Sequence, residues 1–121
     1  MNKYCVEQWE KNKENLHKVF EAEKDFCFFN YQEFAEIVIK NIFPDWKAHV
    51  VDVHYLGDNY SGDVIFFIHS HCDGYCYLSH LYYGSCTVCD TLQRAAGNVN
   101  DLMTVALHLV QGMREPFDVE N

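Results

Sequence analysis

The second part of the chain has very little positive charge. No lysine follows Lys47, and residues 49–121 contain two basic residues, Arg94 and Arg114, against nine acidic ones. Residues 1–48 hold seven lysines against nine acidic residues, so most of the formal net charge of −9 belongs to the second part. An acidic surface repels nucleic-acid backbones and anionic membranes and attracts basic proteins. We therefore expect a protein partner with a basic surface, and no direct binding to nucleic acid or membrane.

Long apolar runs and signal-peptide features are also missing. No run approaches the roughly 20 apolar residues that a membrane-spanning helix needs. The charged N-terminus, "MNKYCVEQWEKNKENL", contains no apolar core of a signal peptide. We expect a cytoplasmic protein. Its 121 residues, 49% of them hydrophobic and 16% aromatic, are enough for a single packed domain over 1–121.

The first 44 residues carry helical signals. Apolar residues between Cys5 and Phe20 fall near one face of a helix over 3–24. Asn30 and Glu33 have the spacing of a capping box for a second helix, which Pro44 ends.

From residue 49 the hydrophobic period changes to two. Strands are expected over 49–56, 64–71 and 75–83, joined by the loop 57–63 and by a type I′ turn at Asp73-Gly74. These strands form an antiparallel meander. The turn places His71 opposite Cys76, and it puts His69, His71, Cys76 and His80 on one face of the sheet.

Two helices are expected after the sheet. Asp90 and Gln93 form a capping box for a short helix that stops at Gly97, and Asn100 caps a last helix that Gly112 closes. Residues 113–121 read as a loose tail. The fold class is therefore α+β: a helical part over 1–44, a β-meander over 49–83, and C-terminal helices over 90–112 that cover one face of the sheet.

Four of the six cysteines are grouped by spacing. In an intracellular protein, thiols and metal ligands are more common than disulfides. Cys72, Cys76, Cys86 and Cys89 could form a tetrahedral zinc site. The expected turn argues against it, because Cys72 and Cys76 then point to opposite faces of the sheet. His71 beside Cys76 is another possible metal pair. We expect no cofactor, with zinc as the alternative.

The pair Cys86 and Cys89 has three interpretations. A C-x-x-C pair before a helix is typical of redox proteins, because the helix N-terminus lowers the pKa of a thiol. It is also a zinc-binding spacing. The third interpretation is a tight strand-to-helix turn built on Gly84 and Ser85. An antiparallel strand precedes the motif and Asp90 opposes a thiolate, so we favour the structural turn and keep zinc and redox open.

The loop 57–63 is a further candidate. Asp58, Tyr60 and Asp63 around two glycines could bind a cation or mark a functional turn. Aspartates in a hairpin loop are more often ordinary turn residues.

One segment resembles a pattern of small uncharacterised proteins of phages, prophages and bacteria. Those proteins carry an aromatic-x-G-D loop and, a hairpin later, an aromatic-G-S-C-S-G-C-D-x-L-Q segment. The resemblance covers about residues 60–93 and departs from the pattern at Thr87-Val88, which replaces Ser-Gly. It carries over to Tyr60, Gly62, Asp63, Tyr83, Gly84, Ser85, Cys86, Cys89, Asp90, Leu92 and Gln93. It implies an origin in a mobile element and gives no reaction.

No set of nucleophile, base and orienting residue is visible, so no catalytic residue is named and we favour a binding protein over an enzyme. A small acidic phage-type protein fits an inhibitor, acting in the host cytoplasm, that docks on the basic nucleic-acid channel of a defence nuclease, as anti-CRISPR proteins do. The alternative is a zinc-binding or thiol-redox protein that uses Cys86 and Cys89. The candidate docking residues are Asp52, Asp58, Asp73, Tyr75, Tyr77 and Tyr82.

Overall fold

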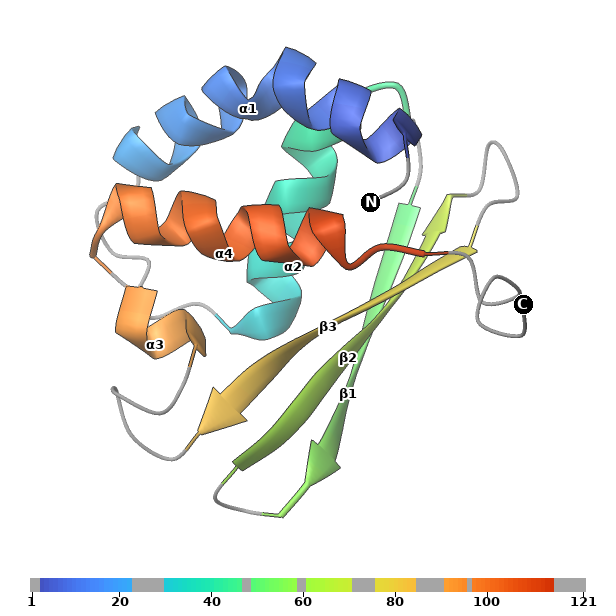
Figure 1. Ribbon diagram of the computed structural model, residues 1–121, viewed down its shortest axis with the longest axis vertical. Helices are drawn as coiled ribbons and strands as arrows, with labels where there is room; N and C mark the ends of the chain where they lie inside the picture. The colour runs from blue at the N-terminus through green and yellow to red at the C-terminus, as the bar shows by residue number, and fades with distance from the viewer. Residues whose placement is uncertain are drawn as a thin grey trace.

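The computed structural model describes residues 3–22, 30–46, 49–58, 61–70, 76–84, 91–95 and 97–114. Two N-terminal helices, three antiparallel strands and two C-terminal helices follow one another, which confirms the expected α+β class (Figure 1). Within the described ranges no helix has the length and apolar character to cross a membrane. The elements are α1 (Lys3–Ala22), α2 (Tyr31–Ile42), β1 (His49–Gly57), β2 (Ser61–Ser70), β3 (Cys76–Gly84), α3 (Thr91–Ala95) and α4 (Val99–Gln111).

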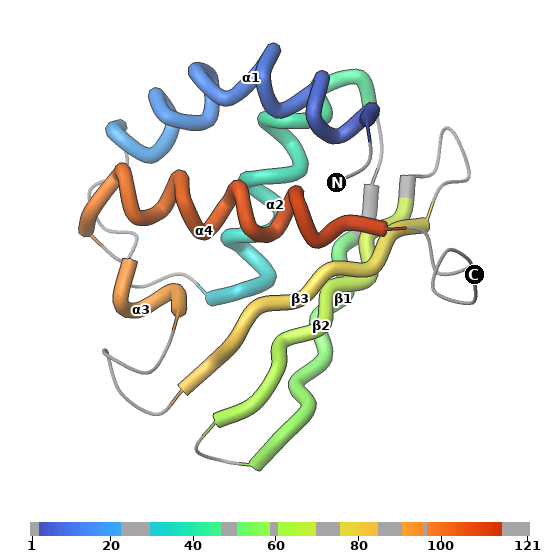
Figure 2. The backbone as a smooth tube through the Cα atoms, viewed as in Figure 1, coloured from blue at the N-terminus to red at the C-terminus, as the bar shows by residue number. Residues whose placement is uncertain are grey.

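The helices lie on one side of the sheet, whose strand order is β1-β2-β3 (Figures 1 and 2). Helix α2 packs on β1, while α3 and α4 pack on β3. Helix α1 lies across α2 and α4, on their side away from the sheet. The sequence led us to expect that the C-terminal helices cover one face of the sheet, and α3 and α4 do pack on it. Helix α2 also covers this face of the sheet and contacts α1 and α4 as well, which explains why its sequence is apolar on most sides.

The core fills the space between the sheet and the helices. Burying one large apolar side chain contributes about 1.5–3 kcal/mol, so this face supplies much of the folding free energy. The buried side chains on the inner face of the sheet are Val51, Val64, Phe66, Ile68, Tyr77 and Leu81. The helices meet them with Phe34, Ala35, Val38, Ile42, Leu102, Ala106 and Leu109 among others.

The helix starts follow local capping chemistry. The Asn30 side chain accepts a hydrogen bond from the Glu33 amide at 2.9 Å, so the expected cap of α2 is confirmed. The expected cap of the last helix at Asn100 is wrong. Asn98 caps α4, because its side chain accepts from the Asp101 amide at 3.1 Å. An acidic residue three positions after Asn98 also suits the positive end of the helix dipole.

The register of the β2–β3 pair differs from the expected one. Cys76 lies opposite His69, not opposite His71, so the strands are shifted by two residues relative to a turn at Asp73-Gly74. That turn and His71 lie outside the described residues. A shift of two residues preserves the side-chain alternation. His69, Cys76 and His80 therefore share a face, as expected.

The first residues of the expected tail are held in place. Met113 is buried, and Arg114 forms an isolated antiparallel bridge with Leu78 at the free side of β3. The two backbone hydrogen bonds of this bridge measure 2.8 and 3.0 Å. The expectation of a loose tail is thus wrong for residues 113 and 114, and residues 115–121 lie outside the described part.

Candidate binding site at the turn end of the sheet

Large apolar side chains with high exposure gather at one end of the sheet. Among the described residues they are Tyr55, Leu56 and Tyr82, which are 53%, 58% and 60% exposed. The register places Leu56 and Tyr82 on either side of Asp63 on the outer face of the sheet, because both lie opposite Asp63 of the central strand. Tyr55 is at the same end but on the inner face, since it pairs with the buried Val64. We call the described residues 55–58, 61–63 and 82–84 the turn end of the sheet. Apolar exposure concentrated in this way is typical of a contact surface.

Described residues from both parts of the pattern noted in the sequence lie together at this turn end. Gly62 pairs with Tyr83, and Asp63 pairs with Tyr82, across the antiparallel β2–β3 ladder. Gly84 lies opposite the residue before Gly62. Residues about 20 positions apart in the sequence are therefore direct neighbours. Of the remaining pattern residues, Leu92 is buried in α3 and Gln93 is exposed there.

Glycine permits the close approach of β1 and β2 at the turn. Gly57 has a φ of +149°, and a Cβ added there would lie 2.5 Å from the Ser61 carbonyl oxygen. A Cβ on the opposite residue, Gly62, would lie 2.2 Å from the Leu56 carbonyl oxygen. No Cβ fits at these distances, so the two strands close here in a way that requires glycine on both sides.

Asp58 acts as a turn residue. One oxygen of its carboxylate accepts from the Ser61 amide at 2.9 Å, and its own amide donates to the Ser61 carbonyl at 3.2 Å. The Tyr83 hydroxyl donates to the Asp58 carbonyl at 2.6 Å and so braces the turn from the third strand. This arrangement favours the ordinary-turn interpretation of Asp58 over a cation site. Tyr60 lies outside the described residues.

Tyr31 connects the turn end to the helices. Its hydroxyl donates to the Tyr82 carbonyl at 2.8 Å and accepts from the Leu92 amide at 3.3 Å. Its ring meets the Tyr55 ring edge-on, with centroids 6.4 Å apart, and Tyr55 meets Tyr83 in the same manner at 5.3 Å. Sequence reasoning missed this role, because Tyr31 lies 51 positions from Tyr82 and 61 from Leu92, and no local pattern links them.

The charges of this region are negative. No lysine or arginine occurs between Lys47 and Arg94, a stretch that includes all three strands. Asp52 is exposed on the outer face of β1, and Asp63 is half-buried between Leu56 and Tyr82. Arg114 sits at the opposite edge of the sheet, beside β3. The acidic residues therefore lie toward β1 and the turn.

The docking residues expected from the sequence differ in their exposure to solvent. Asp52, Asp58 and Tyr82 are exposed. Tyr77 is 3% exposed and stacks on Trp46 with ring centroids 5.7 Å apart, so its expected role as a surface anchor is wrong. The reason is the alternation of β3, which turns Tyr77 to the inner face. Asp73 and Tyr75 lie outside the described residues.

The described part of the chain contains no cluster of three or more histidine, cysteine, aspartate or glutamate side chains that could hold a metal. Cys76 is half-buried and lies opposite His69. His71, Ser85, Cys86, Cys89 and Asp90 lie outside the described residues, so the zinc and redox interpretations of the C-x-x-C pair stay predictions.

Cys5 is a buried thiol in α1 with no exposure to solvent. Burial raises its pKa to about 11, and the nearby N-terminal charge offsets part of this rise. Because the thiolate is the reactive form, Cys5 is a packing residue and not a nucleophile.

Comparison of the chain with protein-family models, with curated proteins and with solved structures found no match.

Proposed function

We propose that this is a small acidic binding protein of the phage or mobile-element type, which docks on a basic protein surface through the turn end of its sheet. The observation that carries the proposal is the joint presence, at this end, of exposed apolar side chains and acidic side chains. Leu56 and Tyr82 supply the apolar area on the outer face, and Asp63 lies between them. Asp58 is exposed at the turn itself, and Asp52 adds charge on the same outer face further along β1.

This combination suits tight contact with a cationic partner. Interface energy is concentrated in a few large side chains that become buried, and tyrosine is enriched among them. Acidic residues around such anchors accelerate association with a basic surface and exclude acidic partners. The bracing of the turn by Tyr83 and Tyr31 supports the proposal as well, because a rigid surface loses less conformational entropy on binding.

The proposed target is a nuclease of host defence, in the manner of an anti-CRISPR protein. Guide-RNA nucleases hold nucleic acid in a positively charged channel, which an acidic protein of this size can occupy. The resemblance to phage and prophage proteins that we expect from residues 60–93 favours the same biological setting. Inhibition then requires no catalytic residue, since the bound protein excludes the nucleic acid.

The test uses purified guide-RNA-loaded Cas nucleases of several types. Binding is measured by interferometry at low and high salt, and DNA cleavage is measured in parallel. We expect association that weakens as salt rises, with loss of cleavage. Tyr82→Ser and Leu56→Ser should each weaken binding by about tenfold or more, because exposed anchors contribute 1–2 kcal/mol or more when they become buried.

Charge variants separate the docking surface from general acidity. Asp52→Asn should slow association and flatten its salt dependence. Asp45→Asn, an equal charge change at an exposed position after α2, is the matched control and should have a smaller effect. If Asp45→Asn and Asp52→Asn act equally and the two anchor variants bind like the wild type, the turn end is not the docking surface. If no nuclease binds, the proposed target class is wrong.

A further inference from the structure

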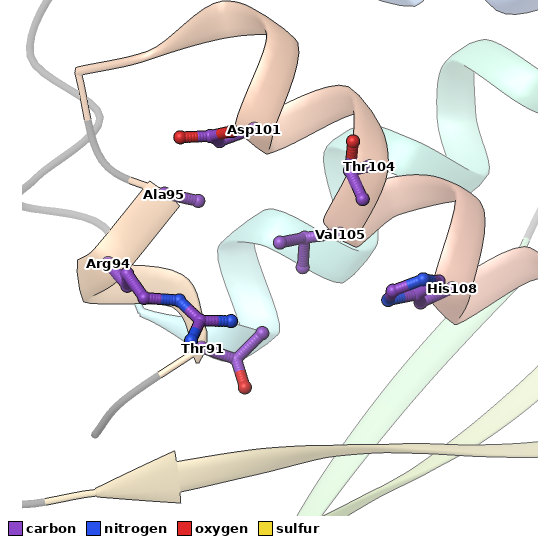
Figure 3. Close-up of a pocket in the computed structure, with 7 residues that line it drawn as sticks. All are labelled: Thr91, Arg94, Ala95, Asp101, Thr104, Val105 and His108. Atoms are coloured by element: carbon purple, nitrogen blue, oxygen red, sulfur yellow. The ribbon is translucent and has the colours of Figure 1, made fainter. Parts of the chain in front are cut away.

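A second candidate site lies between α3 and α4, away from the turn end. A cavity of about 290 Å³ opens there between the two helices. Arg94 extends into it from α3 and His108 faces it from α4, with Val105 between them (Figure 3). Ala95 and Val105 are 4% and 7% exposed and provide an apolar floor. Its volume is at the lower end for ligand sites, which suits a small molecule.

The donors of this cavity are not used by the described part of the chain. The Arg94 guanidinium forms no ion pair there, although the chain as a whole is strongly acidic. The His108 ring and the Thr91 hydroxyl likewise make no hydrogen bond to a described residue. Asp101 also lines the cavity, yet it does not pair with Arg94. A cavity lined by three donors that pair with no described residue, beside apolar side chains, can receive acceptor atoms.

The acceptors lie along the other rim. In Figure 3, Asp101 and Thr104 occupy the rim opposite Arg94 and Thr91. The Thr104 hydroxyl donates to the Asn100 carbonyl at 3.1 Å, so its oxygen is left as an acceptor. Thr91 and Arg94 therefore line the cavity from α3, while Asp101, Thr104 and His108 line it from α4.

We propose that this cavity binds a small organic oxyanion, a carboxylate or a phosphate joined to a short apolar group. Guanidinium groups bind such anions through two parallel N–H donors, which a carboxylate or a phosphate matches in geometry. The anionic head lies against Arg94, with His108 and Thr91 as further donors. The apolar part contacts Val105 and Ala95. Asp101 disfavours a second negative charge at the far end, so compounds with one anionic end bind best.

The experiment is a two-dimensional ¹H–¹⁵N NMR titration of the full chain with butyrate, inorganic phosphate and butylammonium in separate arms. Sodium chloride is held at matched ionic strength. We expect saturable shifts of amides over 91–95 and 101–108 with butyrate or phosphate and none with butylammonium. The two anion arms distinguish a carboxylate site from a phosphate site. Arg94→Gln should weaken the affinity about tenfold, because it removes the bidentate charge-assisted contact.

Arg114→Gln is the matched control, since it removes the same charge from an exposed position beside β3, outside this cavity. It should bind the anion like the wild type. Arg94 is exposed, so its replacement leaves the core intact, and the dispersion of the amide spectrum verifies this. The proposal is overturned if no saturable shifts occur up to tens of millimolar anion. It is also overturned if Arg94→Gln and Arg114→Gln change the titration equally.

Discussion

The close approach of β1 and β2 at Gly62 predicts that Gly62→Ala strongly destabilises the fold. The new Cβ would lie 2.2 Å from the Leu56 carbonyl oxygen and 2.8 Å from the Gly57 Cα. Both are backbone atoms of the facing strand, so no side-chain rotation relieves the contact. The strands must separate at the turn instead.

The magnitude follows from what this separation breaks. Forcing extra atoms into a packed region costs about 1–3 kcal/mol. Two hydrogen bonds join Asp58 and Ser61, and each contributes about 1 kcal/mol. We therefore expect Gly62→Ala to lower the free energy of unfolding by about 3–5 kcal/mol. Gly97→Ala is the control: its Cβ meets nothing within 4 Å, and its φ of +81° costs about 1 kcal/mol in a residue other than glycine.

The assay is urea unfolding of the two variants and the wild type, followed by the fluorescence of Trp9 and Trp46, which are both buried. Gly97→Ala measures the cost of a positive φ without a steric contact, whereas Gly62 has no positive φ and its loss of stability reports the contact with β1. A loss at Gly62→Ala no larger than that at Gly97→Ala would refute the reasoning, because the close approach of the strands would then cost far less than expected.

Four further predictions concern the core and its polar links. Burial raises the pKa of Cys5 from 9.0 to about 11, so the stabilisation by its neutral thiol is complete below pH 9 and is lost as the pH rises toward 11. Urea unfolding across this range should show up to about 3 kcal/mol of lost stability that Cys5→Ala lacks. Ser79→Ala should cost about 1–2 kcal/mol, because the Ser79 hydroxyl donates to an α4 carbonyl at 2.6 Å in the core. In Gly112→Ala the new Cβ would lie 2.8 Å from that hydroxyl oxygen and should destabilise the fold. Ser79→Ala removes the hydroxyl and should restore part of the lost stability. A double-mutant cycle in urea should measure a coupling of about 1 kcal/mol between the two sites. Tyr31→Phe removes the hydroxyl that joins β3 to α3 and should lower stability by about 1–2 kcal/mol in thermal unfolding, whereas an unchanged melting temperature would show that this link contributes nothing.

Local signals in the sequence were sufficient for the element order. The Asn30–Glu33 spacing located the start of α2, because the capping hydrogen bond joins residues three positions apart and both can be recognised in the sequence. The same rule, applied with more care, also identifies Asn98. Asn98 has Asp101 three positions later, whereas Asn100 has the apolar Met103 there.

The exposure of the β3 side chains was harder to predict, because each face of this strand carries both apolar and polar residues. Ser79 is buried on the inner face between Tyr77 and Leu81, while Leu78 lies on the outer face. The hydrogen bond from Ser79 to the Leu109 carbonyl compensates its burial. That partner lies 30 positions away, so the strand sequence alone does not reveal it.

Contacts between distant residues formed the part of the site that no pattern predicted. The turn end depends on Tyr31, a residue of α2 whose hydroxyl bonds to the backbone of β3 and α3. The cavity between α3 and α4 depends on the packing of two helices whose individual sequences read as ordinary amphipathic segments. Such sites arise from tertiary packing, which propensity and spacing do not encode.

The bridge between Leu78 and Arg114 has a consequence for how copies of this chain can associate. The free side of β3 is occupied there by the backbone of residue 114, so an incoming strand cannot form a continuous ladder along it. Among the described residues the other lateral edge of the sheet is β1, where the Val51 carbonyl accepts from the Gln32 side chain at 3.3 Å. Strand pairing between two copies through β1 would occupy that edge on both, which favours a closed two-fold pair over a growing fibre.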